Sequence, residues 1–150
     1  MNIINHFSLL STTQDILSKD KIKVRGASDG YNQMLILSDF YSSDKSIFVV
    51  LPNIYLAQQY YDNLIKYINE DDVLFFPADE LISAEMVSST GDFLFERIQT
   101  LYTLLSNEKK IVVMNMHAAI KYEMPKEKWI KNIFRVNVND EIKLKTFVIN

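Results

Sequence analysis

The sequence predicts an α/β protein in which helices cover both faces of a mainly parallel sheet of about four strands. Continuous runs of β-favouring apolar residues, which suit strands buried on both faces of a parallel sheet, occupy 47–51, 73–76 and 111–114. Stretches with apolar residues at helical spacing separate these runs. Strands that alternate with helices usually form a parallel sheet through right-handed crossovers, so this order indicates a three-layer fold.

The composition bounds the possible functions. The 150 residues, 48% of them hydrophobic, suffice for one domain with a sizeable core, and the net charge of −3 argues against a free-standing nucleic-acid-binding protein. The chain has no cysteine, which excludes disulfides and thiolate metal sites, and its two histidines, His6 and His117, lie far apart in the sequence. No apolar run approaches the roughly 18 residues that span a bilayer, and the N-terminus lacks the pattern of a signal peptide. We therefore expect a cytoplasmic protein with no metal site and no membrane partner.

The first quarter of the chain is predicted to hold two helices and the first strand. Residues 4–18 carry a partial apolar stripe and are predicted to form a helix, broken by the polar residues 11–13. Residues 21–25 alternate basic and apolar side chains, which predicts a short strand. A turn with two of the three glycines follows, and 31–41 is predicted to be the second helix.

The middle of the chain carries the clearest helical patterns. Asn53 is a good N-cap for a helix that we expect to end at Asn69. Residues 78–91 have no strong period and are predicted to form a long connection. Asp92 is expected to cap a helix over 93–105. The predicted buried stripe of that helix comprises Leu94, Ile98, Leu101, Tyr102 and Leu105.

The pattern changes after residue 124. A short helix is predicted over 117–122, and the best domain boundary lies near Pro125, so that 1–124 form one domain and 125–150 begin a second. Residues 126–131 are predicted to form a short helix around Trp129. The alternation of Phe134, Val136 and Val138 predicts a strand, and 141–150 are predicted to begin a helix. The chain therefore looks like a fragment of a longer protein.

The glycine turn lies where α/β nucleotide-binding proteins place a phosphate loop, G-x-x-x-x-G-K-[ST]. When that pattern is anchored on Gly26, its second glycine falls on Tyr31, its lysine on Asn32 and its hydroxyl residue on Gln33, while Gly30 stands one place early. Asn32 has no charge to offset phosphate and Gln33 is a poor magnesium ligand. We therefore favour a strand-to-helix turn that binds no nucleotide, and nucleotide binding is the less favoured alternative.

Other candidate sites have simpler structural interpretations. The acidic pairs Asp71-Asp72 and Asp79-Glu80 are interpreted as solvated loops rather than as metal or acid–base sites, and His117 as a helix-start residue. Adjacent residues on a helix do not face each other, so a buried Arg97 needs a carboxylate other than Glu96. We predict no catalytic residue in this chain.

The C-terminal part has a basic bias that allows two interpretations. A solvated face anchored by Trp129 is favoured over a nucleic-acid or partner patch, because Glu123 and Glu127 dilute the positive charge. The basic residues are Lys121, Lys126, Lys128, Lys131 and Arg135.

Three segments in a fixed order carry a resemblance to a known family. They are the glycine turn 26–30, the segment 73–80 that ends Phe-Pro-Ala-Asp-Glu, and the segment 93–101 with the motif Phe95-Glu96-Arg97, followed by the strand 111–113. This order resembles the N-terminal, UvrB-like module of bacterial transcription-repair coupling factors (Mfd), in which the phosphate loop has lost its lysine. Asp29 in place of a usual small residue departs from that pattern, as does the absence of an aromatic-proline pattern in 81–91.

The resemblance implies a RecA-like, P-loop-type half-domain with a degenerate phosphate loop, interrupted by a second domain that contacts UvrA. It implies a non-catalytic scaffold or docking module in transcription-coupled nucleotide excision repair, with no cofactor of its own. ATP and magnesium, double-stranded DNA and RNA polymerase are then ligands and partners of the full-length translocase. Two alternatives stay open: the first half of a UvrB-like or helicase-like ATPase, and an unrelated α/β interaction module.

Overall fold

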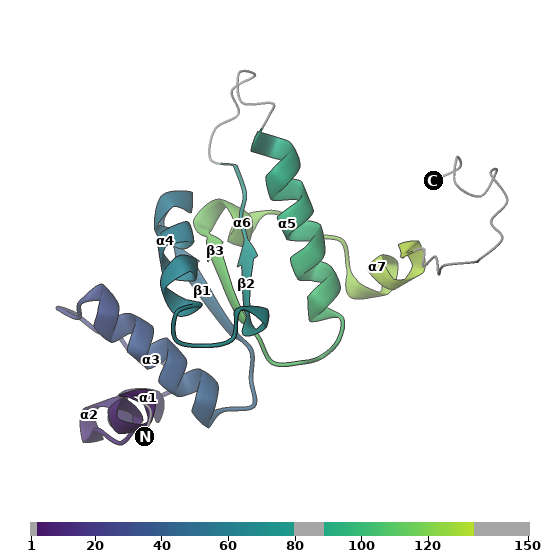
Figure 1. Ribbon diagram of the computed structural model, residues 1–150. Coiled ribbons are helices and arrows are strands. Elements are labelled where there is room, and N and C mark those ends of the chain that lie inside the picture. The colour runs from purple at the N-terminus through teal and green to yellow at the C-terminus, as the bar shows by residue number, and fades with distance from the viewer. Residues whose placement is uncertain (1–2, 80–88, 134–150) are drawn as a thin grey trace, which may run out of the picture.

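The protein forms an α/β fold around a small parallel sheet (Figure 1). This computed structural model describes residues 3–79 and 89–133. The sheet has the strand order β1-β3-β2, with β1 at Ile47–Leu51, β2 at Val73–Phe76 and β3 at Ile111–Asn115. Both pairs are parallel, and Ile111 aligns with Ile47 on one side and with Val73 on the other. All five residues of the central strand β3 are buried, as the continuous apolar runs predict.

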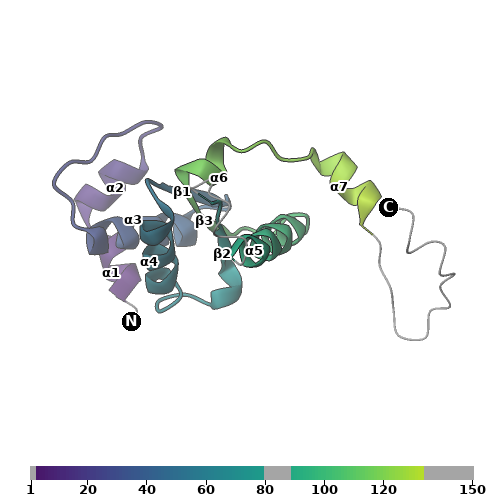
Figure 2. The ribbon, with the colours of Figure 1, turned by 90° about the horizontal axis from the view of Figure 1, so that it is seen from above.

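One face of the sheet is covered by α4, Ile54–Leu64, with α3, Asp29–Ser42, packed outside it (Figure 2). The predicted cap of α4 is confirmed, because Asn53 Oδ1 accepts a 2.8 Å hydrogen bond from the Leu56 amide. The helix ends at Leu64, before the predicted Asn69, and the short 3₁₀ helix η1, Glu70–Asp72, leads into β2. The larger core lies on this side of the sheet and includes Leu37, Phe40, Ala57, Tyr60, Leu64, Val73, Ile111 and Val113.

The opposite face is covered by α5, Ser89–Leu104, over β2 and by the short α6, Met116–Ile120, at the end of β3 (Figure 2). A smaller core of Phe76, Ala78, Val112, Met114 and Ala118 lies there, with Leu74, Leu101 and Leu104 packed against it. Helices on both faces of a parallel sheet confirm the predicted α/β class.

The predicted first strand is wrong. Residues 21–25 form no strand, and Ile22 and Val24 are 42% and 39% exposed. Basic residues at alternate positions place like charges along one side of this segment, and two apolar side chains bury too little surface to offset the cost of ordering it. The described part of the chain therefore has a sheet of three strands rather than four.

The predicted helix over 4–18 is two helices, α1 at Ile3–Ser8 and α2 at Ser11–Leu17, which pack on α3. The break falls at Leu9 and Leu10, whose amides make tight-turn hydrogen bonds to the His6 and Phe7 carbonyls. The polar residues that were expected to interrupt the helix instead begin α2, because Ser and Thr favour the start of a helix over its interior.

The predicted buried stripe of α5 is wrong at three of its five positions, while Leu101 packs against the smaller core and Leu105 is half-buried. Leu94, Ile98 and Tyr102 are 57%, 43% and 47% exposed. Arg97 and Thr100 face the sheet instead, because their side chains reach strand-end carbonyls that need donors. The expected cap at Asp92 is wrong as well, since α5 begins three residues earlier, at Ser89.

The C-terminal elements differ from the predictions only at their ends. Helix α6 begins at Met116, one residue before the predicted start, and Asn115 caps it. The predicted short helix around Trp129 is confirmed as α7, Lys126–Asn132. The predicted strand over 134–138, the predicted helix start over 141–150 and most of the connection over 78–91 lie outside the described residues.

Candidate functional site

The glycine turn lies between α2 and α3 and follows no strand. Gly26 has φ of 74°, which L side chains rarely adopt, so a glycine is needed there to turn the chain. Ser28 then caps α3, and its Oγ accepts a 3.3 Å hydrogen bond from the Tyr31 amide. Gly30 lies inside the first turn of α3, and a Cβ atom at Gly30 would meet no atom within 4 Å. Neither backbone contact nor strain thus requires the second glycine.

The three positions on which the phosphate-loop pattern falls carry side chains that are buried or half-buried. The Tyr31 ring stacks edge-on against Phe7 of α1, with centroids 5.1 Å apart. Gln33 is 6% exposed and Asn32 is half-buried. The buried Gln33 side chain has little access to a magnesium ion, and Asn32 carries no charge that would offset a phosphate.

A carboxylate occupies the first turn of α3. Asp29 accepts a 3.0 Å hydrogen bond from the Tyr60 hydroxyl of α4. Burial raises the pKa of Tyr60, and the hydrogen bond to Asp29 raises it further. A negative charge at a helix N-terminus interacts favourably with the helix dipole and repels a second anion, so Asp29 stands against phosphate binding there.

The carboxyl ends of the strands, where open α/β sheets bind ligands, hold a buried polar cluster. Asn115 ends β3, and its side chain bridges to the chain after β2. Its Oδ1 accepts a 3.0 Å hydrogen bond from the Ala78 amide, and its Nδ2 donates a 2.8 Å hydrogen bond to the Ala78 carbonyl. The same Oδ1 caps α6 by accepting from the Ala118 amide at 3.4 Å. These bonds tie the two strand ends together.

Arg97 fills the rest of this cluster. Its side chain is 6% exposed and donates a 2.9 Å hydrogen bond to the Pro77 carbonyl. A second guanidinium nitrogen pairs with Glu123, which supplies the carboxylate that a buried arginine was predicted to need. The guanidinium carbon lies 4.2 Å from the centroid of the Phe76 ring, and burial lowers the pKa of Arg97. Within the motif, Phe95 is 65% exposed and only Arg97 turns inward.

Sequence reasoning missed three buried polar residues, two that bond near the carboxyl ends of the strands and one just before β3. Thr100 donates a 2.7 Å hydrogen bond to the Phe75 carbonyl, and Asn115 makes the bridge described above. Lys110, just before β3, is 6% exposed. A polar residue directly after the apolar run 111–114 was a usable signal for Asn115, but Thr100 has no such signal in the sequence.

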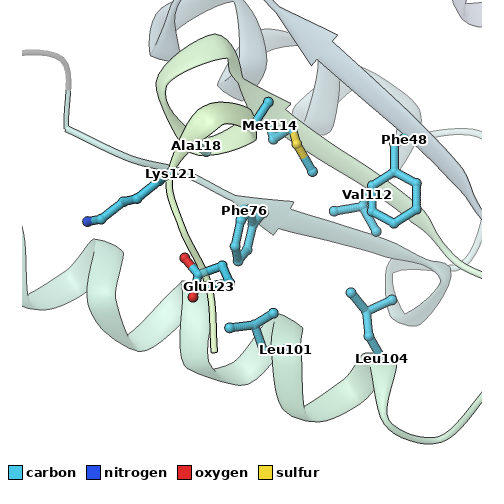
Figure 3. Close-up of a pocket in the computed structure, with 10 residues that line it drawn as sticks. Phe48, Phe76, Leu101, Leu104, Val112, Met114, Ala118, Lys121 and Glu123 are labelled. Atoms are coloured by element: carbon cyan, nitrogen blue, oxygen red, sulfur yellow. The ribbon is translucent and has the colours of Figure 1, made fainter. Parts of the chain in front are cut away.

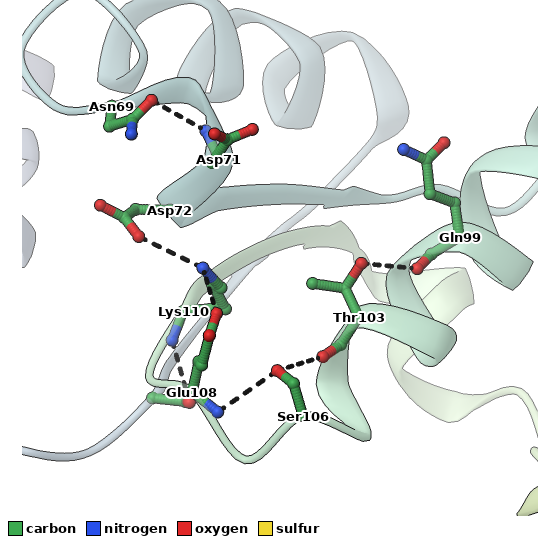
Figure 4. Close-up of polar contacts among 9 residues, drawn as sticks. Asn69, Asp71, Asp72, Gln99, Thr103, Ser106, Glu108 and Lys110 are labelled. Atoms are coloured by element: carbon green, nitrogen blue, oxygen red, sulfur yellow. Dashed lines mark hydrogen bonds and ion pairs between the residues drawn. The ribbon is translucent and has the colours of Figure 1, made fainter.

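The acidic residues near η1 serve Lys110 (Figure 4). Its Nζ lies 3.3 Å from Asp72 Oδ1 and 3.2 Å from Glu108 Oε2. Burial works to lower the pKa of Lys110, but the two carboxylates outweigh it and the pKa is raised. Asp71 is exposed, and within the described ranges no three His, Asp or Glu side chains gather as a metal site. Asp72 therefore has a structural use, and Glu80 lies outside the described residues.

An apolar groove of about 270 Å³ opens on the sheet face that carries α5 and α6 (Figure 3). Its walls include Phe48, Phe76, Leu101, Leu104, Val112 and Met114. Its charged lining residues are Lys121 and Glu123. Phe48 and Val50 of β1 remain 58% and 43% exposed on this face. The groove thus exposes apolar surface that a folded protein normally covers.

The basic C-terminal residues lie on the surface wherever the structure describes them. His117, Lys121, Lys126, Lys128 and Lys131 are exposed, Trp129 is half-buried, and Arg135 lies outside the described residues. Lys126 donates to the Asn107 side chain at 2.9 Å. No helix of the described residues has the length and apolar character to cross a membrane.

This chain is similar to known proteins over most of the length of the chain. It is 22% identical to the transcription-repair-coupling factor of Staphylococcus haemolyticus over 134 residues, 89% of this chain. It is similar to transcription-repair-coupling factors. The factors of Staphylococcus epidermidis and Staphylococcus aureus are 20% and 21% identical over 98% and 96% of this chain. The resemblance predicted from the motif order is confirmed by these relatives.

The chain spans 12–13% of the length of these curated relatives. No protein-family model and no solved structure matches it.

Proposed function

We propose that this chain is the N-terminal, UvrB-like half-domain of a transcription-repair-coupling factor and that it works without binding nucleotide. In this proposal residues 1–124 are a RecA-like half-domain that serves as a scaffold and docking module in transcription-coupled nucleotide excision repair. Residues 125–150 begin an inserted second domain that contacts UvrA.

The glycine turn is the observation that carries the non-catalytic part of the proposal. Gln33 is buried where a magnesium-binding hydroxyl is needed, and Asp29 places a carboxylate at the start of α3. The loop has no lysine to offset a phosphate charge. Similarity to transcription-repair-coupling factors over 89–98% of the chain supports the assignment to that kind of protein.

In this proposal the motor of the full-length protein lies outside residues 1–150. That motor is an ATP-dependent DNA translocase, which uses ATP and magnesium, moves on double-stranded DNA and displaces stalled RNA polymerase. The half-domain contributes no catalytic residue, and its role is to present the second domain to UvrA.

Calorimetric titration of the chain with Mg-ATP tests the absence of a nucleotide site. The expected result is no saturable heat at protein concentrations of about 0.1 mM, at which a micromolar Kd gives a complete isotherm. Saturable micromolar binding that disappears in a Gly26→Val variant would overturn the proposal and favour a UvrB-like or helicase-like ATPase. Saturable binding that persists in that variant would also overturn it, and would place the nucleotide elsewhere.

A further inference from the structure

Strand β2 has an open edge that borders a second groove, here called the edge groove. The strand pairs with β3 on one side, and no other strand of the described ranges pairs with it. On its free side lies the edge groove, about 460 Å³ in volume, which is lined by Val73, Leu74 and Phe75 of β2 and by side chains of α4, η1 and α5. An open strand edge presents backbone groups to which another extended segment can bond.

The register of the sheet shows which backbone groups of β2 face the edge groove. The Ile47 amide donates a 3.0 Å hydrogen bond to the Lys110 carbonyl, so the backbone of Lys110 is directed at β1. Successive residues of a strand alternate in this respect, so the backbone groups of Ile111 are directed at β2. Ile111 aligns with Val73, and in a parallel pair a residue bonds to the neighbours of the residue with which it aligns. Leu74 is such a neighbour and therefore directs its backbone groups at β3.

Val73 and Phe75 consequently direct their backbone groups at the edge groove, and two contacts agree with this. The Phe75 carbonyl accepts a 2.7 Å hydrogen bond from Thr100 of α5, and the Val73 amide donates to the Glu70 carbonyl of η1. Within the described residues no partner meets the other two groups, the Val73 carbonyl and the Phe75 amide. They flank Leu74 as one acceptor and one donor, which is the pair of groups that a single residue of an added strand bonds.

The rim of the edge groove is acidic. Its carboxylates are Glu70, Asp71, Glu96 and Glu108. Glu108 pairs with Lys110, the basic residue among the described lining residues. Glu70, Asp71 and Glu96 are exposed and form no ion pair with a described residue. Figure 4 shows part of this rim, with Asp71 of η1 and side chains of α5. The edge groove therefore carries negative charge that the described residues do not neutralise.

The negative potential reaches the interior of the edge groove. Tyr61 of α4 lines it and packs against Phe75, with ring centroids 5.6 Å apart. Burial raises the pKa of Tyr61, and the charges of Glu70 on η1 and Glu96 on α5 raise it further. Carboxylates from two elements thus act on one side chain. A surface of this charge attracts a cationic partner and repels the phosphates of nucleic acids.

We propose that the open edge of β2 binds an extended, basic peptide segment of a partner protein as an added strand. One residue of the segment bonds to the Val73 carbonyl and the Phe75 amide. Adjacent side chains of a strand point to opposite faces, so neighbouring Lys or Arg residues of the segment reach the carboxylates of η1 and of α5. Strand β2 has four residues and is about 13 Å long, so the bound stretch comprises about four residues.

Amide hydrogen exchange followed by NMR tests the added strand at the atom that makes it. The probe is a terminally blocked peptide, Thr-Val-Lys-Lys-Val-Lys-Lys-Thr. We expect a saturating amount of it to slow exchange of the Phe75 amide by about tenfold or more. The Val50 amide, which alternates with the bonded Ile47 and so faces the outer edge of β1, is the control and is expected to keep its rate. Slower exchange at Val50 with no change at Phe75 would place the peptide on the wrong edge and refute the proposal.

Charge and backbone are then separated by calorimetric titration with the same peptide. Glu96→Lys is expected to weaken binding by about tenfold, whereas Glu127→Lys, the same change on exposed α7, alters it by less than about twofold. A peptide with methylated backbone nitrogens at its central lysines keeps its charge and is expected not to bind, because it cannot pair as a strand.

Three results would count against the added strand. They are no saturable binding of the unmethylated peptide, equal binding of the methylated one, and a dimer of the chain that protects the Phe75 amide without peptide. The last result would assign the edge of β2 to a second copy of the chain.

Discussion

Glu123 and Arg97, 26 residues apart in the chain, form an ion pair that joins α5 to the segment leading into α7. The arginine also holds the Pro77 carbonyl and lies over the Phe76 ring. The Arg97 side chain thus connects the end of β2, helix α5 and the segment that leads into α7. Glu123 is 32% exposed, so water screens part of this interaction.

We predict that Glu123→Gln destabilises the fold by about 1–2 kcal/mol, because it leaves the buried Arg97 charge without its carboxylate. Urea denaturation followed by circular dichroism measures this loss. Glu127→Gln, the same change on exposed α7, is expected to shift the free energy of unfolding by less than about 0.5 kcal/mol. Equal effects of the two variants would show that the ion pair adds nothing to stability.

Two threonines of α5 offer a matched comparison. Thr100→Val removes the buried hydrogen bond to the Phe75 carbonyl and is expected to cost about 1–2 kcal/mol. The Thr103 hydroxyl is exposed and donates to the Gln99 carbonyl of its own helix, so Thr103→Val is expected to change stability by less than about 0.5 kcal/mol. Thermal unfolding of both variants gives the comparison, and a smaller loss for Thr100→Val than for Thr103→Val would contradict the packing of α5 described above.

The two glycines of the turn are predicted to respond in opposite directions. Gly26→Ala forces a Cβ atom into a positive φ and is expected to cost about 1 kcal/mol. Gly30→Ala lies in a helix with open space around it and is expected to stabilise the protein by about 0.5–1 kcal/mol. Melting temperatures of the two variants measure this. In a working phosphate loop both glycines are needed for the backbone to approach phosphate. Loss of ATPase activity in a full-length Gly30→Ala protein would therefore favour the alternative of a UvrB-like or helicase-like ATPase.

Asn115→Ala is predicted to be more damaging than Asn53→Ala. Asn115 bridges the Ala78 amide and carbonyl inside the protein, and its loss leaves buried groups unpaired at a cost of about 2–4 kcal/mol. Asn53 caps α4 at a half-buried position, and caps of this kind are worth about 1 kcal/mol. Chemical denaturation at 25 °C measures the free energy of unfolding of both variants. Similar losses would mean that the Asn115 bridge between the strand ends contributes no more to stability than a helix cap.

Stability is predicted to fall above the ordinary tyrosine pKa of 10.0. The pKa of Tyr60 is raised in the folded state by burial and by Asp29, so the unfolded chain loses this proton first and the stabilisation disappears as the pH rises through the folded pKa. Tyr60→Phe is expected to make the decline above pH 10.0 shallower than in the parent protein. Unfolding curves at stepped pH test this, with Tyr55→Phe at an exposed position as the control. If stability declines with pH as steeply in Tyr60→Phe as in the parent protein, Tyr60 does not cause the decline.

The buried strands and their order along the chain were predictable, and the candidate site was predictable only in part. The runs at 47–51, 73–76 and 111–114 form strands, as continuous β-favouring apolar sequence predicts. The expected burial on both faces holds for the central strand β3, whereas Phe48 and Val50 of the edge strand β1 are exposed. The need of a buried Arg97 for a distant carboxylate was also predictable, but the identity of Glu123 was not. An ion pair across 26 residues depends on where two elements pack, and no local pattern records that.

The sequence by itself determined the α/β class, the parallel strands, the cap at Asn53 and the absence of phosphate-loop side chains at Asn32 and Gln33. Each of these depends on residue type and on neighbours within a few positions. The tertiary structure decided that 21–25 is not a strand and that α5 turns Arg97 and Thr100 inward. A strand needs a pairing partner from a distant part of the chain, which the pattern of 21–25 does not supply. In α5, the carbonyls of Pro77 and Phe75 need hydrogen-bond donors, and this need outweighs the apolar pattern of the helix.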